Sequence, residues 1–139
     1  MQKNTNYNKE LTDEKTDEKT QVINVGVKNI RPQYLNLHQW ILDKKSNVYI
    51  GRSRVVFIDG IRYPFEDSIW ANPYKITETQ SREKVLELYH EFIEKKLNSE
   101  PMLIEKLKEL DGKKLGCWCK PDCCHGDILV ELITKYKNT

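Results

Sequence analysis

The stretch that decides the fold is KLGCWCKPDCCHGD, residues 114–127. Residues 114–119 are predicted to form a strand, and Pro121 then forces a turn. A helix is expected from about Cys124 to Tyr136, because apolar residues recur on one face of that segment. These residues are Ile128, Leu129, Leu132, Ile133 and Tyr136. The stretch therefore predicts a strand, a tight turn and a closing helix in direct succession.

Strand patterns dominate the chain before this stretch. Residues 22–27 form a β-branched run that is typical of a strand, and residues 47–51 predict a second, shorter one. Asp59-Gly60 tolerates the positive φ angles of a type I′ turn. A β-hairpin is therefore expected between residues 54–58 and residues 61–63.

Helix patterns follow the loop of residues 64–80. Ser81 is expected to cap a helix that runs to about Leu97, and Ser99 is expected to cap a second helix that Gly112 ends. Strands, then helices, then a strand and a helix predict an α/β or α+β fold. We expect a small mixed β-sheet with a β-hairpin, packed by about three helices, in a single domain.

Composition sets the broad class of protein. The chain has 139 residues, a net charge of +2 and a mean hydropathy of -0.71, which suits one domain with a single core. No apolar run approaches the roughly 20 residues of a membrane span, and residues 1–20 lack the apolar segment of a secretory signal. These first residues are polar and repeat TDEK, so they are predicted to form a disordered tail before a globular domain at 21–139. A cytoplasmic protein without membrane contact is therefore expected.

The four cysteines are confined to residues 117–124, which is too short a segment for a useful disulfide framework. Alternate residues of a strand face the same side, so Cys117 and Cys119 can present two sulfurs to one point. Cys123, Cys124 and His125 return at the start of the expected helix, where the helix dipole favours a thiolate. Three sulfurs and an imidazole are a common tetrahedral set for Zn²⁺, so the cluster predicts a zinc site.

Other chemistries fit the same cluster. Cys124 at a helix N-terminus, next to His125 and near Asp127, has the parts of an activated nucleophile. This interpretation predicts an enzyme with Cys124 and Asp127 as catalytic residues. Clustered cysteines also hold iron–sulfur clusters or carry redox chemistry, and reduced cysteines packed in a core are the plain structural interpretation.

Residues 110–127 also resemble the closing motif of the domain-of-unknown-function family 4326, which occurs in phages, bacteria and large DNA viruses. VYIGR at 48–52 and SIWANPY at 68–74 are similar to two further motifs of that family. The resemblance covers about residues 48–136, and residues 33–46 resemble an insertion. By its name, the family implies no established activity.

The resemblance also selects among the cysteines. It implies a shared site made of Cys117, Cys119, Cys124 and His125, which we expect to be the zinc ligands. Cys123 is then an addition outside the ligand set.

Two shorter segments supply candidate ligand-binding residues. Arg52 follows an expected strand and offers a bidentate guanidinium to a phosphate or carboxylate. Trp70 and Tyr74 can stack on a base, and Asn72 can hydrogen-bond to its edge. The structural alternative places Arg52 on a solvated hairpin edge, Trp70 in the core and Asn72 in a turn. We expect a nucleotide or a nucleic-acid end to bind Arg52, Trp70 and Asn72 beside the zinc site.

Overall fold

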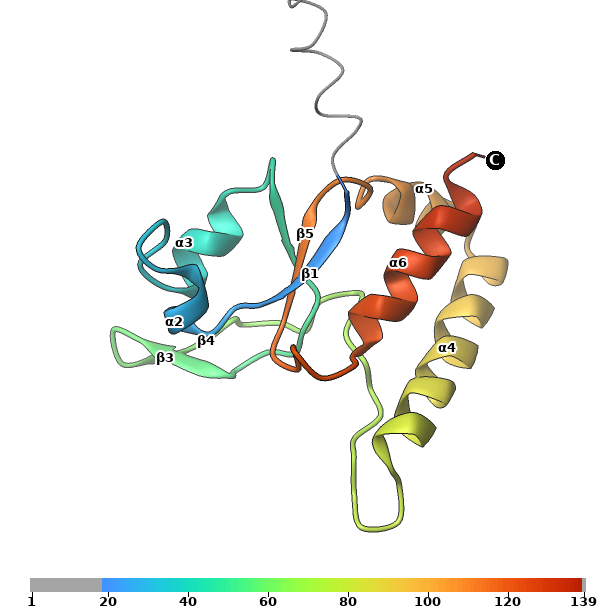
Figure 1. The fold of residues 1–139 in the computed structure, drawn as a ribbon, viewed down its shortest axis with the longest axis horizontal. Coiled ribbons are helices and arrows are strands. Elements are labelled where there is room, and N and C mark those ends of the chain that lie inside the picture. The colour runs from blue at the N-terminus through green and yellow to red at the C-terminus, as the bar shows by residue number, and fades with distance from the viewer. Residues whose placement is uncertain (1–18, 139) are drawn as a thin grey trace, which may run out of the picture.

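Three parallel strands form the central sheet of the molecule. They are β1 (Gln21–Asn24), β5 (Lys114–Cys117) and β2 (Asn47–Tyr49), and they lie side by side in the order β1-β5-β2. A computed structural model describes residues 19–138 of the chain, and Figure 1 shows β5 in the middle of the fold. The predicted tail at residues 1–20 lies outside the described residues except for its last two.

The hairpin predicted around Asp59-Gly60 is confirmed. β3 (Val56–Ile58) and β4 (Ile61–Tyr63) pair antiparallel with Ile58 opposite Ile61. Asp59 and Gly60 have φ angles of 53° and 80°, as a type I′ turn requires. The two strands form a sheet of their own beside the parallel one.

Three helices cover one face of the parallel sheet, and they are the three that the sequence predicts. They are α4 (Arg82–Ser99), α5 (Pro101–Lys108) and α6 (His125–Tyr136). Figure 1 shows them together on one side, with the shorter α2 (Val27–Ile30) and α3 (Leu37–Leu42) on the other. The mixed α/β fold with a hairpin is therefore confirmed, with two short helices in addition.

The helix caps follow the prediction at one position and depart from it at another. Ser81 caps α4, because its side chain accepts a hydrogen bond from the Lys84 N–H. Ser99 does not cap α5: it is the last residue of α4, and its hydroxyl donates to the Lys96 carbonyl. Glu100 is both the C-cap of α4 and the N-cap of α5, so Ser99 lies one residue before the capping position.

Three strand predictions run too far. The strand expected at 47–51 ends at Tyr49. The strand expected at 22–27 ends at Asn24, because Gly26 turns the chain into α2 and Val27 is the first helical residue. The strand expected at 114–119 ends at Cys117. The side chain of Asn24 contacts the backbone beyond the ends of β1 and β5. Its oxygen accepts from the Gly26 N–H, and its amide donates to the carbonyls of Trp118 and Lys120 after β5.

The central strand separates two apolar clusters. Leu115 and Cys117 are buried against helices α4, α5 and α6, whereas Gly116 faces the opposite cluster around Trp40. A Cβ atom at Gly116 would lie 2.5 Å from the Trp40 ring and 2.6 Å from Val25. Successive residues of β5 face opposite sides of the sheet, so the strand contacts both apolar clusters. The cluster around Trp40 comes so close that only glycine fits at residue 116.

No helix within residues 19–138 is long and apolar enough to cross a bilayer. All three parallel strands end at the same edge of the sheet, after Asn24, Tyr49 and Cys117. Ligand sites of parallel α/β sheets lie at this carboxyl edge. The cysteine motif follows β5 directly, so the fold places it where such a site is expected.

Candidate functional site

A cleft of about 480 Å³ opens at the carboxyl edge of the parallel sheet. One wall comes from the end of β5 and the start of α6, and the other from the segments around Arg52 and Asn72. We call the first the cysteine wall (Cys117, Cys119 and Cys124) and the second the arginine wall (Arg52 with residues 72–75). Arg52, Asn72 and the cysteine motif, which were predicted from separate segments, are therefore brought together in one place.

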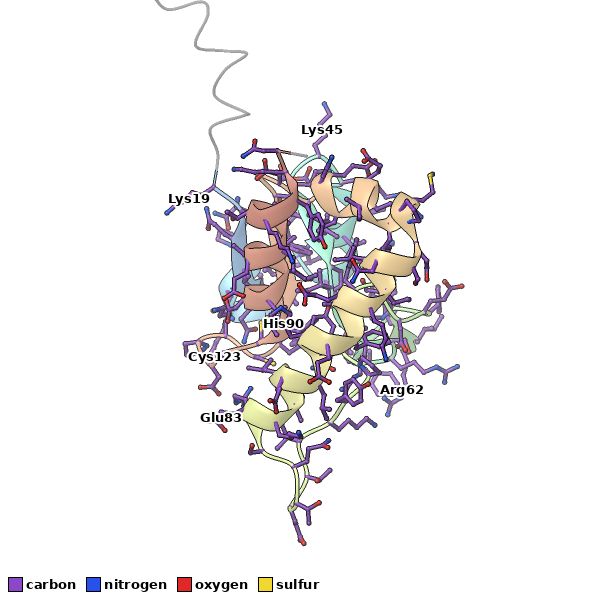
Figure 2. All side chains as sticks on the ribbon, turned by 90° about the vertical axis from the view of Figure 1, so that its right-hand side faces the viewer. Lys19, Lys45, Arg62, Glu83, His90 and Cys123 are labelled. Atoms are coloured by element: carbon purple, nitrogen blue, oxygen red, sulfur yellow. The ribbon has the colours of Figure 1, made fainter. Side chains whose placement is uncertain are left out.

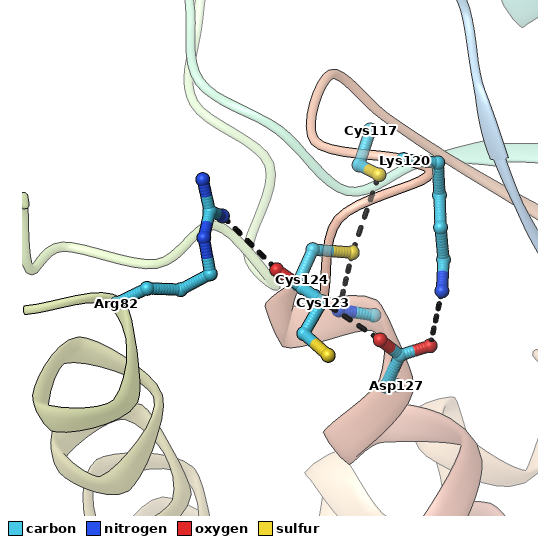
Figure 3. A network of polar contacts seen from close by, with 7 residues as sticks. Arg82, Cys117, Lys120, Cys123, Cys124 and Asp127 are labelled. Carbon is cyan, nitrogen blue, oxygen red and sulfur yellow. Dashed lines mark hydrogen bonds and ion pairs between the residues drawn. The ribbon is translucent and has the colours of Figure 1, made fainter.

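Three thiols line the cysteine wall. The sulfurs of Cys117 and Cys124 are 3.3 Å apart (Figure 3). Cys117 ends β5 and Cys124 is the N-cap of α6, where its sulfur accepts from the Gly126 N–H. Cys119 lies in the loop after β5 and not in the strand, and it is partly buried against the same apolar cluster. The contact between Cys117 and Cys124 thus joins the end of the strand to the start of the helix.

These contacts divide the thiols by acidity. Interaction with the Cys124 side chain lowers the pKa of Cys119 to about 6 and that of Cys117 to about 7. The guanidinium of Arg82 beside Cys119 lowers the pKa of that thiol further. Contact with Cys117 and Cys119, together with burial, raises the pKa of Cys124. Cys124 is thus the least acidic of the three thiols.

His125 and Cys123 lie differently from the three clustered thiols. The Nε2 atom of His125 is 2.7 Å from the Ile50 carbonyl, its ring packs edge-on against Tyr89, and burial lowers its pKa. Cys123 is exposed, and Figure 3 shows its sulfur pointing away from Cys117. In the part of the chain that the structure describes, no group of three or more His, Cys, Asp or Glu side chains is arranged to hold a metal ion.

Asp127 forms a capping box with Cys124. One carboxylate oxygen accepts from the Cys124 N–H at 3.1 Å, and the other accepts from the Lys120 ammonium at 2.7 Å. The carboxylate therefore fixes the start of α6 and the loop before it. Its recorded partners are this backbone N–H and the Lys120 side chain, so Asp127 holds the backbone that carries Cys124.

The arginine wall is held by backbone carbonyls. Arg52 donates from Nε and Nη2 to the Asn72 carbonyl at 3.1 and 2.9 Å, and from Nη2 to the Tyr74 carbonyl at 2.9 Å. The Asn72 side chain accepts from the Tyr74 N–H, as in an Asx turn. Both side chains thus shape the loop, and none of the three Arg52 contacts uses its Nη1 atom.

Trp70 lies in the core and not in the cleft. It is 3 % exposed, and its carbonyl accepts a hydrogen bond from the buried Tyr89 hydroxyl. This placement agrees with the structural alternative for residues 70–74. The tryptophan that lines the cleft is Trp118, whose indole N–H donates to the Tyr49 hydroxyl.

Sequence reasoning missed two further residues at the site. Arg82 donates to the Cys123 carbonyl and lies 3.5 Å from Asp122, so it joins the start of α4 to the cysteine loop. Asn24 holds the same loop from the end of β1. Neither residue lies in a recognisable motif, since both act on backbone atoms that are far away in the sequence. Asn24 lies in the middle of the strand predicted at 22–27, so its place at the strand end was not foreseen.

The sequence model of a domain of unknown function, DUF4326, matches residues 35–135. The chain belongs to the DUF4326 family. The DUF4326 region begins at residue 35 and not near residue 48 as predicted, so it includes α3 and both walls of the cleft. No solved structure matches the chain significantly.

Two uncharacterised viral proteins are similar to this DUF4326 chain. One is the 12.4 kDa protein of the nrdA-td intergenic region of Enterobacteria phage T4, 34% identical over 68 residues, which are 49% of this chain and 62% of the phage protein. The other is protein R718 of Acanthamoeba polyphaga mimivirus, 36% identical over 101 residues, which are 65% of this chain and 71% of that protein. The predicted family resemblance is confirmed.

Proposed function

We propose that the cleft binds a nucleotide, either free or at the end of a nucleic-acid strand. The observation that carries this proposal is the charge of the cleft. Its lining includes the cationic residues Arg52, Lys75 and Arg82, and no Asp or Glu is among the described lining residues. Such a lining favours an anionic ligand, and a phosphate is the anion that guanidinium groups bind best.

The rest of the lining suits the base of a nucleotide. Val55, Ile76, Val85 and Leu86 give the cleft apolar sides, and Tyr74 and Trp118 bring aromatic rings to it. Aromatic side chains can stack on any of the bases, because every base has a π-face. A volume of about 480 Å³ lies in the usual range for small-molecule sites.

The test is calorimetric titration of the full chain with a nucleoside 5′-monophosphate, ribose 5-phosphate, an unphosphorylated nucleoside and a 5′-phosphorylated oligonucleotide. We expect the monophosphate to bind more tightly than either of its parts, because phosphate and base use different parts of the lining. Tighter binding of the oligonucleotide would identify a strand end as the ligand. Absence of binding by both the nucleoside monophosphate and the phosphorylated oligonucleotide at millimolar concentration would contradict the proposal.

Lys75 offers a variant with a matched control. It is an exposed lysine at the cleft, and Lys45 is an exposed lysine near the top of Figure 2, away from Cys123. Lys75→Ala should weaken monophosphate binding about five-fold, which is the effect of losing one screened charge contact. Lys45→Ala should leave binding unchanged.

Zinc binding by the cysteine wall is a second candidate function. The contact between Cys117 and Cys124, with Cys119 in the same cleft lining, favours it, because thiolates are the ligands that zinc prefers in proteins. The three sulfurs would have to turn toward a common point, and His125 would have to leave the Ile50 carbonyl to act as the fourth ligand. The cluster therefore contains side chains that can coordinate zinc, but they are not arranged around a common point.

Elemental analysis of untagged protein tests this second candidate. Zinc at one equivalent, lost in Cys117→Ser and Cys124→Ser and kept in Cys123→Ser, would support it. Iron with visible absorption would support an iron–sulfur cluster instead. A cytoplasmic location is proposed with both candidates, since free thiols persist in a reducing compartment.

A further inference from the structure

A groove of about 420 Å³ lies against β2, the strand at one edge of the parallel sheet. Asn47, Val48 and Tyr49 all line this edge groove. Successive residues of a strand point to opposite faces, so a groove that all three line lies at the free edge of β2 and not over one face. None of its described lining residues lines the cleft, so the edge groove is a separate feature of the molecule.

The backbone of β2 presents two unpaired groups at this edge. The Ser46 carbonyl accepts from the β5 backbone at 2.8 Å, and the Ile50 N–H donates to it at 3.0 Å. Backbone groups alternate between the two edges of a strand, so those of Tyr49 point to the free edge. Within residues 19–138 neither its N–H nor its C=O has a hydrogen-bond partner, although Tyr49 is only 8 % exposed. Buried backbone groups are nearly always paired, so this edge favours an occupant that pairs with both.

Asn47 adds an unpaired acceptor at the start of β2. Its side chain is buried, and its Nδ2 atom donates to the Trp40 carbonyl at 2.9 Å. Its Oδ1 atom is buried too and has no hydrogen-bond partner in the described part of the chain. A buried polar atom without a partner costs free energy, so the edge groove favours a ligand with hydrogen-bond donors. An extended peptide offers donors and acceptors in alternation along its backbone, and it is the ligand class that fits.

The two ends of the edge groove differ in charge. Lys44 and Lys113 line it near the start of β2, and the Lys113 ammonium donates to the Lys44 carbonyl at 3.3 Å. Glu66 lines it near the end of β2, where the Ser68 N–H donates to the Gly51 carbonyl. Two ammonium groups at one end favour a peptide whose acidic residues lie at that end.

We propose that the edge groove binds an extended, acidic peptide segment of a partner protein, which adds to β2 as a further strand of the central sheet. The peptide backbone pairs with the N–H and C=O of Tyr49, and its acidic side chains contact Lys44 and Lys113. Apolar side chains at alternate positions pack against Ile41 and Tyr63. This binding is independent of the proposed nucleotide binding in the cleft.

The experiment titrates the full chain with two synthetic heptapeptides, acetyl-Asp-Glu-Val-Thr-Val-Thr-Val-amide and the same residues in reverse order. The first brings its acidic end to the two lysines when it lies parallel to β2, and the second does so when it lies antiparallel. We expect one of the two to bind. The control is that same peptide with every valine and threonine amide methylated, which keeps its side chains and charge. It should bind about ten-fold more weakly, because it has lost the backbone donors.

Amide hydrogen exchange, followed by NMR, locates the bound peptide. The Tyr49 amide should exchange about ten-fold more slowly in the complex, since its N–H then has a partner. Val22 is the matched control at the opposite edge of the sheet. Gln21 and Val25 donate to the backbone around β5, so the Val22 amide points away from the sheet and should exchange at an unchanged rate.

Two lysine variants test the charge of the edge groove. Lys44→Ala should weaken binding of the acidic peptide about five-fold, as expected for the loss of one exposed ion pair. Lys95→Ala removes the same charge from an exposed lysine of α4 and should leave peptide binding unchanged. Both side chains are exposed, so neither variant disturbs the core.

Several results would overturn the proposal. These are no binding of either peptide at millimolar concentration, equal binding of the methylated peptide, unchanged exchange of the Tyr49 amide, and undiminished binding by Lys44→Ala. A dimer of the free chain in which the Tyr49 amide is already protected would assign the edge of β2 to a second copy, and this too would overturn it.

Discussion

The two walls of the cleft are built in different ways. The cysteine wall comes from one short segment, in which Cys117, Cys124 and Asp127 interact across ten residues or fewer. The arginine wall joins Arg52 to carbonyls 20 and 22 residues away. In a wall made of neighbours in sequence the contacts can be read from one motif, whereas the motifs of the arginine wall do not show that Arg52 binds the carbonyls of the other segment.

The largest expected effect lies beneath the cysteine wall, at Gly116. Gly116→Ala places a Cβ atom 2.5 Å from the Trp40 ring and should lower the free energy of unfolding by about 3 kcal/mol. The measurement is equilibrium denaturation in guanidinium chloride.

Gly60→Asn is the control for Gly116→Ala. It lies in the hairpin turn with no atom within 4 Å of a built Cβ, and Asn tolerates its positive φ, so it should cost less than about 1 kcal/mol. Equal effects of the two variants would show that β5 is not packed tightly between the two layers.

The next effect tests the arginine wall. Arg52→Ala removes three charge-assisted hydrogen bonds to the carbonyls of Asn72 and Tyr74, so it should lower the free energy of unfolding by about 2 kcal/mol and also weaken nucleotide binding. Arg52→Lys should recover only part of this, because an ammonium lacks the planar fork that reaches both carbonyls. Thermal unfolding and calorimetry measure the two effects.

Arg62 supplies the control for Arg52. It is an exposed arginine of the hairpin that donates to one carbonyl, that of Arg54. Arg62→Ala should change stability by less than about 0.5 kcal/mol. If Arg52→Ala is as mild as Arg62→Ala, the carbonyl contacts do not hold the arginine wall together.

A smaller effect is expected in the cysteine wall itself. Asp127→Ala removes the capping box of α6 and the contact with Lys120, at a cost of about 1 kcal/mol. Asp122→Ala is the control, since that exposed carboxylate pairs with Arg82 at 3.5 Å and should contribute less than about 0.5 kcal/mol. Urea denaturation of both variants would contradict this ranking if Asp122→Ala were the more damaging.

The smallest effect concerns the N-terminal segment, outside both walls. Removal of residues 1–18 should leave the melting temperature unchanged, because their sequence has almost no apolar side chains to bury. Removal of residues 1–20 should cost about 1 kcal/mol, since Thr20 accepts a hydrogen bond from the Gly112 N–H at 2.7 Å. A lower melting temperature for the shorter deletion would show that the tail contributes to stability.

Much of the fold follows from local patterns. Asp59-Gly60 predicted the hairpin turn, and Ser81 with the apolar stripe after it predicted α4. These signals work because turn geometry and helix caps depend on a few adjacent residues. Residues 34–42 gave no clear pattern, and their helix α3 depends on packing of Trp40 against Gly116 in a distant strand.

The sequence by itself determined the cysteine cluster and its neighbourhood. Cys117, Cys119 and Cys124 lie within eight residues of chain, and a strand followed by a tight turn and a helix brings such residues together. Their convergence was predictable although the strand proved shorter, because the chain is too short to carry them far apart.

Only the tertiary structure decided what the other candidate residues do. Trp70 entered the core while Trp118 reached the cleft, and Arg52 took the carbonyls of Asn72 and Tyr74 as partners. The sequence specifies the side chains, but it does not distinguish one backbone carbonyl from another as a hydrogen-bond partner. Which tryptophan is buried and which carbonyl meets a guanidinium are settled when the parallel strands align their ends at one edge of the sheet.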